Sequence, residues 1–459
     1  MENKNKQKGI LTLEIVFCIG LTAMFLSGAL ALFFSNQYLI IDTENNHKGL
    51  RMSKTGFEEA RVQGFGFAGA VPVNQEGFIQ EGGYVWLSDY VKQIYSRTRY
   101  FTMNRALAVE LDGLAVDKEN ALGRDTCALS FSGDWAHPQV RSSISGGGGS
   151  VGRDVDVLGS TAYVAADGDG AAADFFAVNV NSPDAPVILS SLNTGPGLRQ
   201  IHVAGEYVYA ANTGVEQLEI VKIADPSAPV VSKKIKMASY VSAVDAGARS
   251  IFYFNKKIFL GLEKNSGPEF FVFDVSSPES PLYLGSFETD SVVTSIYVYG
   301  SQAYLATGGE KRLRILDISD PGHILENQSF IPNLGSGVQS GESLAVLGDR
   351  IFLGRAAGLP SAGIKELYAL TSADLSLPTF EVDLNSSVDG MFYRDGLLFL
   401  AVKPSGANKA FEVFSFENQV LTRIGQVDLI ADAVGLDCEG QNMFISLDSN
   451  AILEIVSAQ

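Results

Sequence analysis

One acidic side chain near the start of the sequence lies at the edge of a long apolar run. Glu14 is followed by residues 15–34, a stretch of twenty residues without a charged side chain. A carboxylate at this boundary of a hydrocarbon layer costs roughly 2–3 kcal/mol unless a positive group compensates it. Glu14 is therefore a candidate functional residue whose carboxylate needs a cationic partner.

The apolar run has the length of a membrane span. Twenty helical residues at about 1.5 Å each cover roughly 30 Å, the thickness of a bilayer core. Lys4, Lys6 and Lys8 precede the run, and an excess of lysine marks the cytoplasmic side. The sequence predicts a single-pass transmembrane helix over about 10–35 in the cytoplasmic membrane, with the N-terminus inside and the rest of the chain at the cell surface.

The residues around Glu14 resemble the N-terminal motif of type IV pilins and pseudopilins. A short basic leader ends at Gly9, the next residue is Ile10, and Glu14 is the fifth residue after the glycine. The resemblance implies that a prepilin peptidase cleaves between Gly9 and Ile10 and methylates the new amine. It also implies that Glu14 pairs with the N-terminal amine of a neighbouring subunit during assembly. The family usually has Phe where Ile10 stands, so cleavage is expected and methylation is left open.

Two other interpretations of the N-terminal segment are open. The small-x-small pattern at Ala29–Ala31 fits a secretory signal peptide, and the apolar run alone fits a plain anchor. Neither alternative accounts for the positions of Gly9 and Glu14, so the pilin-like interpretation is favoured.

The remaining chemistry-bearing residues form no strong constellation. The acidic turn 167–170, with Asp174 beyond it, has the look of a calcium loop but lacks the later bidentate acid that such loops need. Cys127 and Cys438 are the two cysteines beyond the apolar run, and their pairing is open because nothing in the sequence fixes their geometry. The sequence predicts no metal site, no cofactor and no catalytic group.

The overall charge restricts the partners of the protein. The net charge is −18, while charged residues make up only 19% of the chain. A nucleic-acid-binding domain needs a basic footprint for the phosphate backbone, so nucleic acid is excluded as a partner.

Self-similarity is the strongest signal in the second half of the chain. A turn residue is followed four positions later by an aromatic residue, and the aromatic residues recur every 45 to 50 positions. These pairs are Gly159/Tyr163, Gly205/Tyr209, Asn255/Phe259, Gly300/Tyr304, Gly348/Phe352, Asp395/Phe399 and Gly440/Phe444. Four short apolar strands in each repeat are typical of a β-propeller blade, so the sequence predicts seven blades with the aromatic residues filling the core between them.

A separate prediction concerns which segment of the chain closes the ring of blades. The seventh repeat ends at Gln459 after its third strand, whereas residues 138–145, upstream of the first repeat, parallel the fourth strand at 186–193. We expect residues 139–145 to supply the missing strand, which removes an open edge. On this interpretation Gly146–Gly149 joins that outer strand to the innermost strand of the first blade.

The repeats resemble the LVIVD-repeat family of bacterial propellers. The segments that carry the resemblance are 218–221, 271–274 and 313–317, and the resemblance covers about 150–459. It implies a propeller fold but no single activity.

The sequence therefore predicts an N-terminal transmembrane pilin-like α-helix with a small α+β head, followed by an all-β seven-bladed β-propeller. The boundaries are a prepilin leader at 1–9, a pilin-like helix at 10–63, a small head at 64–135 and the propeller at 136–459.

The predicted function is that of a non-enzymatic minor pilin or pseudopilin-like subunit whose propeller mediates adhesion or protein or polymer interaction. Its expected partners are other pilin-like subunits in a filament or membrane complex, the prepilin peptidase, and a protein or polysaccharide target. Two alternatives are open: a membrane-anchored ligand-binding propeller, and a propeller hydrolase outside any filament.

Overall fold

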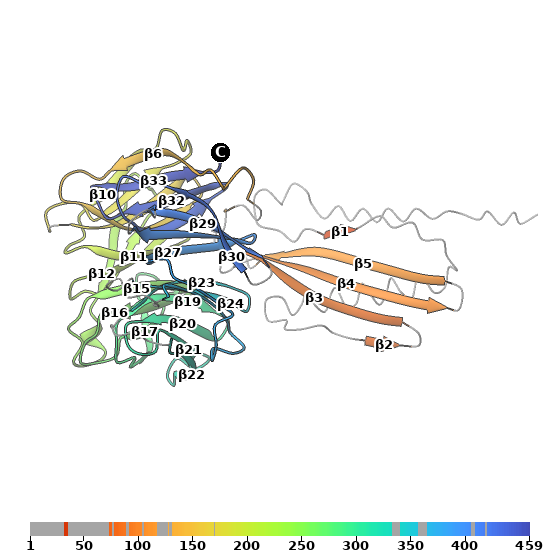
Figure 1. Ribbon diagram of the computed structural model, residues 1–459. Coiled ribbons are helices and arrows are strands. Elements are labelled where there is room, and N and C mark those ends of the chain that lie inside the picture. The colour runs from red at the N-terminus through yellow and green to blue at the C-terminus, as the bar shows by residue number, and fades with distance from the viewer. Residues whose placement is uncertain are drawn as a thin grey trace, which may run out of the picture. The chain divides into compact units, whose positions relative to one another are not determined.

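The computed structural model describes two compact units, Met1–Ala121 and Leu122–Gln459 (Figure 1). The described residues are five strands between 32 and 116, Cys127, and residues 131–459 apart from 169, 333–339, 357–364, 405–408 and 418–419. Within these residues no helix is long and apolar enough to cross a membrane.

The described part of the first unit is one antiparallel sheet. Its strand order is β1-β5-β4-β3-β2. The strands are β1 (Leu32–Phe34), β2 (Val73–Gln75), β3 (Phe78–Ser88), β4 (Val91–Thr102) and β5 (Arg105–Val116). Long hairpin pairing holds the sheet together, since β4 pairs with β5 from Val91 opposite Val116 to Thr102 opposite Arg105.

The described residues test two sequence predictions for this unit only in part. The α+β head expected at 64–135 contains only strands among its described residues up to Val116. Leu32–Phe34, expected at the end of a helix, is a strand paired with Leu111–Gly113, because edge pairing satisfies its backbone groups in place of helical hydrogen bonds. The rest of the predicted helix 10–63 lies outside the described residues.

The second unit contains seven four-stranded antiparallel sheets. The blades, in chain order, are β7 (Val151–Leu158), β8 (Thr161–Asp167), β9 (Phe175–Asn179) and β10 (Val187–Leu192); β11 (Leu198–Ala204), β12 (Tyr207–Asn212), β13 (Leu218–Lys222) and β14 (Val230–Ile235); β15 (Ala248–Phe254), β16 (Lys257–Leu262), β17 (Phe270–Asp274) and β18 (Leu282–Phe287); β19 (Val293–Tyr299), β20 (Gln302–Thr307), β21 (Leu313–Asp317) and β22 (Leu325–Phe330); β23 (Gly341–Leu347), β24 (Arg350–Arg355), β25 (Leu367–Thr371) and β26 (Phe380–Val382); β27 (Ser387–Arg394), β28 (Leu397–Lys403), β29 (Phe411–Glu417) and β30 (Val420–Val427); and β31 (Ala433–Glu439), β32 (Asn442–Leu447), β33 (Ala451–Ser457) and β6 (Gln139–Ser145). A short 3-10 turn, η2 (Met237–Ser239), follows β14. The predicted seven-bladed propeller is confirmed.

The last blade closes the ring in the predicted way. β6 is the outer strand beside β33, with Ser145 opposite Ala451 and Gln139 opposite Ser457. Figure 1 shows β6, from the start of the propeller, alongside the blue strands from its end. Closure places the innermost strands β31 and β7 in contact, so the first and last blades also meet at the centre.

Hydrophobic clusters fill the gaps between neighbouring blades. In the described propeller each of seven clusters contains one of the repeated aromatic side chains. Tyr163, for example, packs with Leu198 and Ile201 of the next blade, and Phe444 packs with Val155 and Ala162 across the closure. A single blade has two apolar faces, so only a complete ring buries both.

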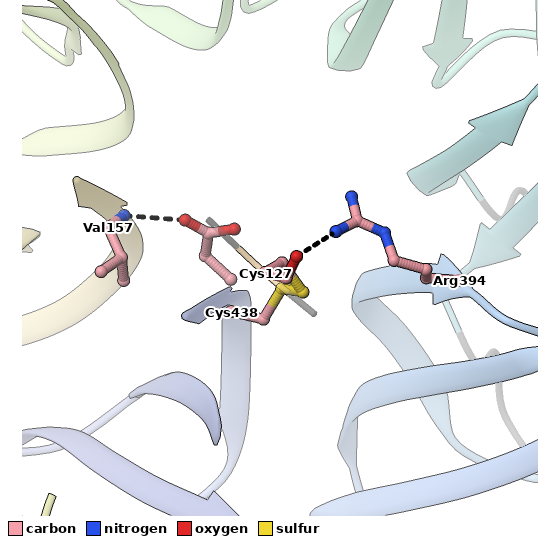
Figure 2. The surroundings of a disulfide bond; sticks show 5 residues. Cys127, Val157, Arg394 and Cys438 are labelled. Carbon is pink, nitrogen blue, oxygen red and sulfur yellow. Dashed lines mark hydrogen bonds between the residues drawn. A yellow bond between two sulfur atoms is a disulfide. The ribbon is translucent and has the colours of Figure 1, made fainter. Parts of the chain in front are cut away.

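The innermost strands are also joined by side chains of the preceding blade. Asp154 accepts a hydrogen bond from the Ile201 amide at 3.0 Å, and Asp156 accepts one from the Val203 amide at 2.8 Å. The same contact crosses the closure, where the Val157 amide donates to Asp437 at 2.7 Å (Figure 2). These carboxylates satisfy backbone N–H groups at the free inner edges of the sheets.

A disulfide joins Cys127 to Cys438, whose Cα atoms are 5.3 Å apart and whose sequence separation is 311. Figure 2 shows the Arg394 guanidinium donating to the Cys127 carbonyl, at 3.1 Å. Trp135, close to this bridge in sequence, packs against Phe399 with ring centroids 4.8 Å apart. Cys127 and Trp135, which the sequence placed in the small head, thus belong to the propeller unit and cover its sixth and seventh blades.

Replacing both cysteines, Cys127→Ser with Cys438→Ser, is expected to destabilise the propeller by roughly 2–5 kcal/mol, because the bridge restricts a very long loop in the unfolded chain. Thermal unfolding followed by far-UV circular dichroism measures the loss. Reducing the wild-type protein is the matched control and is expected to give the same melting temperature as the double variant. Equal stability of the oxidised, reduced and double-variant proteins would contradict the structural role of the bridge.

Candidate binding site at the mouth of the propeller channel

The residues predicted for processing and assembly, Gly9, Ile10 and Glu14, lie outside the described residues. Their roles therefore stay predictions from the sequence.

The acidic residues Asp167 and Asp174, which made this turn resemble a calcium loop, bind other residues of the propeller. Asp167 pairs with Arg153 at 2.6 Å and with Arg199 at 3.0 Å. Asp174 accepts hydrogen bonds from the amide and hydroxyl of Thr194, at 2.7 and 3.0 Å. Within the described part of the chain, no group of three or more His, Cys, Asp or Glu side chains is placed to hold a metal ion.

A β-bulge recurs at the start of the innermost strand in every blade. In each of the seven strands one residue has no partner in the second strand, and the register resumes after it. The bulged residues are Arg153, Arg199, Arg249, Thr294, Glu342, Asp389 and Val434. A bulge re-aims a side chain out of the regular alternation of a strand.

All seven bulges lie at one cavity. It has a volume of about 190 Å³, and all seven bulged residues line it. Residues that follow the bulge in the same strand also line it in every blade except the third, the blade of Arg249. Since every blade contributes its innermost strand, the cavity is the mouth of the central channel.

The charges around the mouth form two chains of ion pairs with alternating sign. In the longer chain Asp167 bridges Arg199 and Arg153, and Asp448 then bridges Arg153, at 2.8 Å, to Lys403, at 3.9 Å. This chain ends at Asp389, which pairs with Lys403 at 3.2 Å.

The shorter chain consists of Glu263, Arg249 and Glu342. Arg249 pairs with Glu263 at 3.8 Å and with Glu342 at 3.4 Å. The Arg249–Glu342 pair reaches from the third blade to the fifth, past Thr294 of the fourth, so it crosses part of the mouth.

Side chains of the same charge lie next to each other at the two places where the two series of ion pairs adjoin. At one place are Glu342 and Asp389, whose side chains are only 15% and 17% exposed. Burial raises the pKa of Glu342, hydrogen bonding from Ser340 and the charge of Arg249 lower it, and neighbouring Asp389 raises it again. Burial likewise raises the pKa of Asp389 against the charge of Lys403. We call Glu342 and Asp389 the acidic pole.

The other junction is basic. Burial lowers the pKa of Arg199, the charge of Asp167 raises it, and the neighbouring guanidinium groups of Arg153 and Arg249 lower it. Arg199 and Arg249 are the bulged residues of adjacent blades. We call Arg199 and Arg249 the basic pole; it lies on the second and third blades, and the acidic pole on the fifth and sixth.

Buried carboxylates at the start of third strands hold the loops that lead into the innermost strands. Asp174 binds the Thr194 loop, and Glu366 accepts from the amides of Leu384 and Asn385 at 2.8 and 3.2 Å. These loops lie at the same end of the strands as the bulges. The carboxylates therefore hold in place the loops around the mouth, although removing their charge from water costs free energy.

Sequence reasoning missed the ring of bulged residues. Once the repeats are aligned, Gly152-Arg153-Asp154 corresponds to Leu198-Arg199-Gln200 and to Ala248-Arg249-Ser250. That alignment is a signal by which the charged position is recognisable. The direction in which this side chain points is not recognisable from the sequence, because the alternation of side chains along a strand does not indicate where a bulge reverses that alternation.

The fold and this mouth define the described second unit as a seven-bladed β-propeller. It contains LVIVD repeats, because residues 198–236 and 292–331 match the model of the LVIVD repeat family. Two of the three segments that carry the resemblance in the sequence, 218–221 and 313–317, fall within these ranges, and 271–274 does not.

Comparison with whole proteins adds little to this assignment. No curated protein matches the chain. Among solved structures, BamB from Moraxella catarrhalis is similar with 12% identity, 71% of this chain and 93% of that chain covered, and a TM-score of 0.43. A catalytically inactive variant of virginiamycin B lyase from Staphylococcus aureus with quinupristin is similar with 11% identity, 70% and 100% covered, and a TM-score of 0.46. Likeness at this level carries no information about activity or partners.

The buried carboxylate of Glu366 makes the stability of the propeller depend on pH. Burial raises its pKa, nearby Asp383 adds to the rise, and the amides of Leu384 and Asn385 oppose it. A raised pKa means that the folded state binds the proton more tightly than the unfolded state, so stability falls as pH rises from the ordinary value through the folded one. Glu366→Gln keeps an acceptor for both amides and is expected to gain melting temperature relative to the wild type between about pH 5 and pH 8.

The matched control is Asp374→Asn, at an exposed acid whose pKa is lowered by its hydrogen bonds from Ser376. Its difference from the wild type is expected to stay constant over the same pH range, because both states are already ionised there. If the difference in melting temperature between Glu366→Gln and the wild type does not change with pH, burial does not raise the pKa of Glu366.

Proposed function

We propose that the protein is a non-enzymatic, surface-displayed binding protein whose propeller is the interaction head and whose N-terminal segment assembles as a minor pilin or pseudopilin does. The head faces outward from the cytoplasmic membrane, and its target is a protein or a polymer. The observation that carries the display role is the position of Glu14, five residues beyond Gly9 at the edge of an uncharged stretch.

The chemistry of the N-terminal segment supports assembly. A carboxylate in a low-dielectric helix bundle is stable only beside a cation, and cleavage after Gly9 creates an amine at Ile10. A neighbouring subunit's amine is then the matching charge for Glu14. A minor role in a filament follows from the size of the head, because a propeller on every subunit would crowd a closely packed shaft.

The construction of the propeller supports a binding role. Each blade places one bulged side chain at the mouth, and the charges there are positioned by ion pairs with one another. Preorganised charges lose little conformational freedom when a partner binds, which favours affinity. The small size of the mouth also favours a second candidate, an anchored propeller that binds a small ligand without forming a filament.

The mature protein is expected to begin at Ile10. Mass spectrometry of the N-terminal peptide from purified membranes measures the start and also shows whether the amine is methylated. A start near Leu32 would select secretory cleavage, and an intact leader would select a plain anchor; either result would contradict the pilin-like role.

Glu14→Ala is expected to leave cleavage intact but to abolish incorporation into surface assemblies, because the subunit then lacks the charge that meets a neighbouring amine. Sheared surface fractions probed with an antibody to the propeller measure incorporation. Glu2→Ala, in the leader, is the control and is expected to assemble normally. Normal assembly of the Glu14→Ala variant would favour the anchored alternative.

A further inference from the structure

The mouth of the channel carries charges of both signs in one small cavity, where the Arg249–Glu342 ion pair at 3.4 Å joins the basic pole to the acidic pole. The bulged residues of the second and third blades, Arg199 and Arg249, are basic, and those of the fifth and sixth blades, Glu342 and Asp389, are acidic. All four line the cavity. The bulge gives each of them the same structural origin, so the opposite charges occupy equivalent positions of a ring.

The ion pairs around the two poles are shared, since Arg249 serves both Glu263 and Glu342, and Lys403 serves both Asp389 and Asp448. At the acidic pole Arg249 and Lys403 flank two carboxylates that are adjacent to each other. At the basic pole the described contacts of Arg199 include one ion pair, with Asp167, which also serves Arg153. A guanidinium has five N–H donors in a planar fork, so Arg199 keeps donor capacity for an anion.

We propose that the mouth of the propeller binds a zwitterionic small molecule of amino-acid size. Its ammonium group lies between Glu342 and Asp389, and its carboxylate faces Arg199 and Arg249. The inference deepens the proposed binding role of the propeller and rests on it.

A zwitterion fits this mouth better than an ion of one sign. An anion beside Arg199 and Arg249 relieves the repulsion between two guanidinium groups that line one cavity, but it leaves Glu342 and Asp389, which line the same cavity, without a further cation. A simple cation has the converse effect. A molecule that carries both charges relieves both repulsions at once, and each contact is a charge-assisted hydrogen bond.

The volume of the cavity limits the size of the ligand. The cavity has a volume of about 190 Å³. Pockets for drug-sized ligands are larger, at ~300–1,000 Å³. The lining is almost wholly polar apart from Leu344, Met391, Val434 and Leu436, so the short connection between the two charges has only a small apolar surface to contact.

The test uses the full-length protein in detergent with three probes of similar shape. γ-Aminobutyrate carries both charges, butylamine only the positive one and butyrate only the negative one. Isothermal titration calorimetry is expected to give γ-aminobutyrate an affinity about tenfold or more above either singly charged probe, since it makes charged hydrogen bonds at both poles and each of the others at only one. Glycine and ε-aminohexanoate, titrated in the same way, show which charge separation the mouth prefers.

The site of binding is read from the methyl groups of labelled methionine. Met391 lines the cavity, whereas Met237 and Met443 are completely buried in two different inter-blade clusters. Saturating γ-aminobutyrate is expected to shift the ¹³C-methyl signal of Met391 and to leave those of Met237 and Met443 in place. The two unmoved signals also report that a variant is folded.

Substitutions at each pole measure its contribution to binding separately. Asp389→Asn combined with Glu342→Gln is expected to reduce the affinity for γ-aminobutyrate to that for butyrate. Arg199→Gln is expected to reduce it to that for butylamine. Asp225→Asn and Arg141→Gln change the same residue types on outer turns and strands away from the mouth, and are expected to bind γ-aminobutyrate as the wild type does.

Several results would overturn the proposal. They are equal affinity for all three probes, no heat and no Met391 shift with any zwitterion at millimolar concentration, and an affinity for γ-aminobutyrate that the Arg199→Gln variant retains. None of these results would bear on where the mature protein begins or on whether Glu14→Ala abolishes incorporation into surface assemblies. Failure of the ligand and failure of the display role are therefore distinguishable.

Discussion

The pairing of β6 with β33 is the interaction on which the rest of the propeller depends. It joins residues 139–145 to the last strand of the chain and turns seven sheets, each with two apolar faces, into a closed ring in which every face is covered. The Cys127–Cys438 bridge and the packing of Trp135 on Phe399 hold the same region together. Without this closure the innermost strands of the first and last blades would not meet and no mouth would exist.

The charged mouth is a consequence of that ring. A bulge at the start of each innermost strand presents one side chain to the centre, and the ring brings seven such side chains to a single cavity. Carboxylates of one blade, such as Asp154 and Asp156, hold the inner edge of the next, so the positions of the charges are fixed relative to one another. Buried acids such as Glu366 secure the surrounding loops and make the frame sensitive to pH. The stability of the propeller and the binding role that we propose for it thus rest on the same polar contacts.

Particular residues show how far sequence reasoning reached. The turn and aromatic pairs from Gly159/Tyr163 to Gly440/Phe444 located the second strand of every blade, and the likeness of 138–145 to 186–193 located the closing strand. The head before the propeller was expected to be α+β, whereas its described residues are strands, as is Leu32–Phe34. Isolated short segments do not distinguish helix from strand well, because tertiary pairing overrides local preference.

The sequence alone determined the number of blades and the way the ring closes, because repeated apolar strands with marked turns are a local property and recur with a fixed period. The prediction of a leader ending at Gly9, and the role proposed for Glu14, also come from the sequence alone. Only the tertiary structure decided that Cys127 and Cys438 are bonded and that Arg199, Arg249, Glu342 and Asp389 share one cavity. The physical reason is that these residues come from different blades, and that a bulge redirects a side chain without any change in the residues that a sequence pattern records.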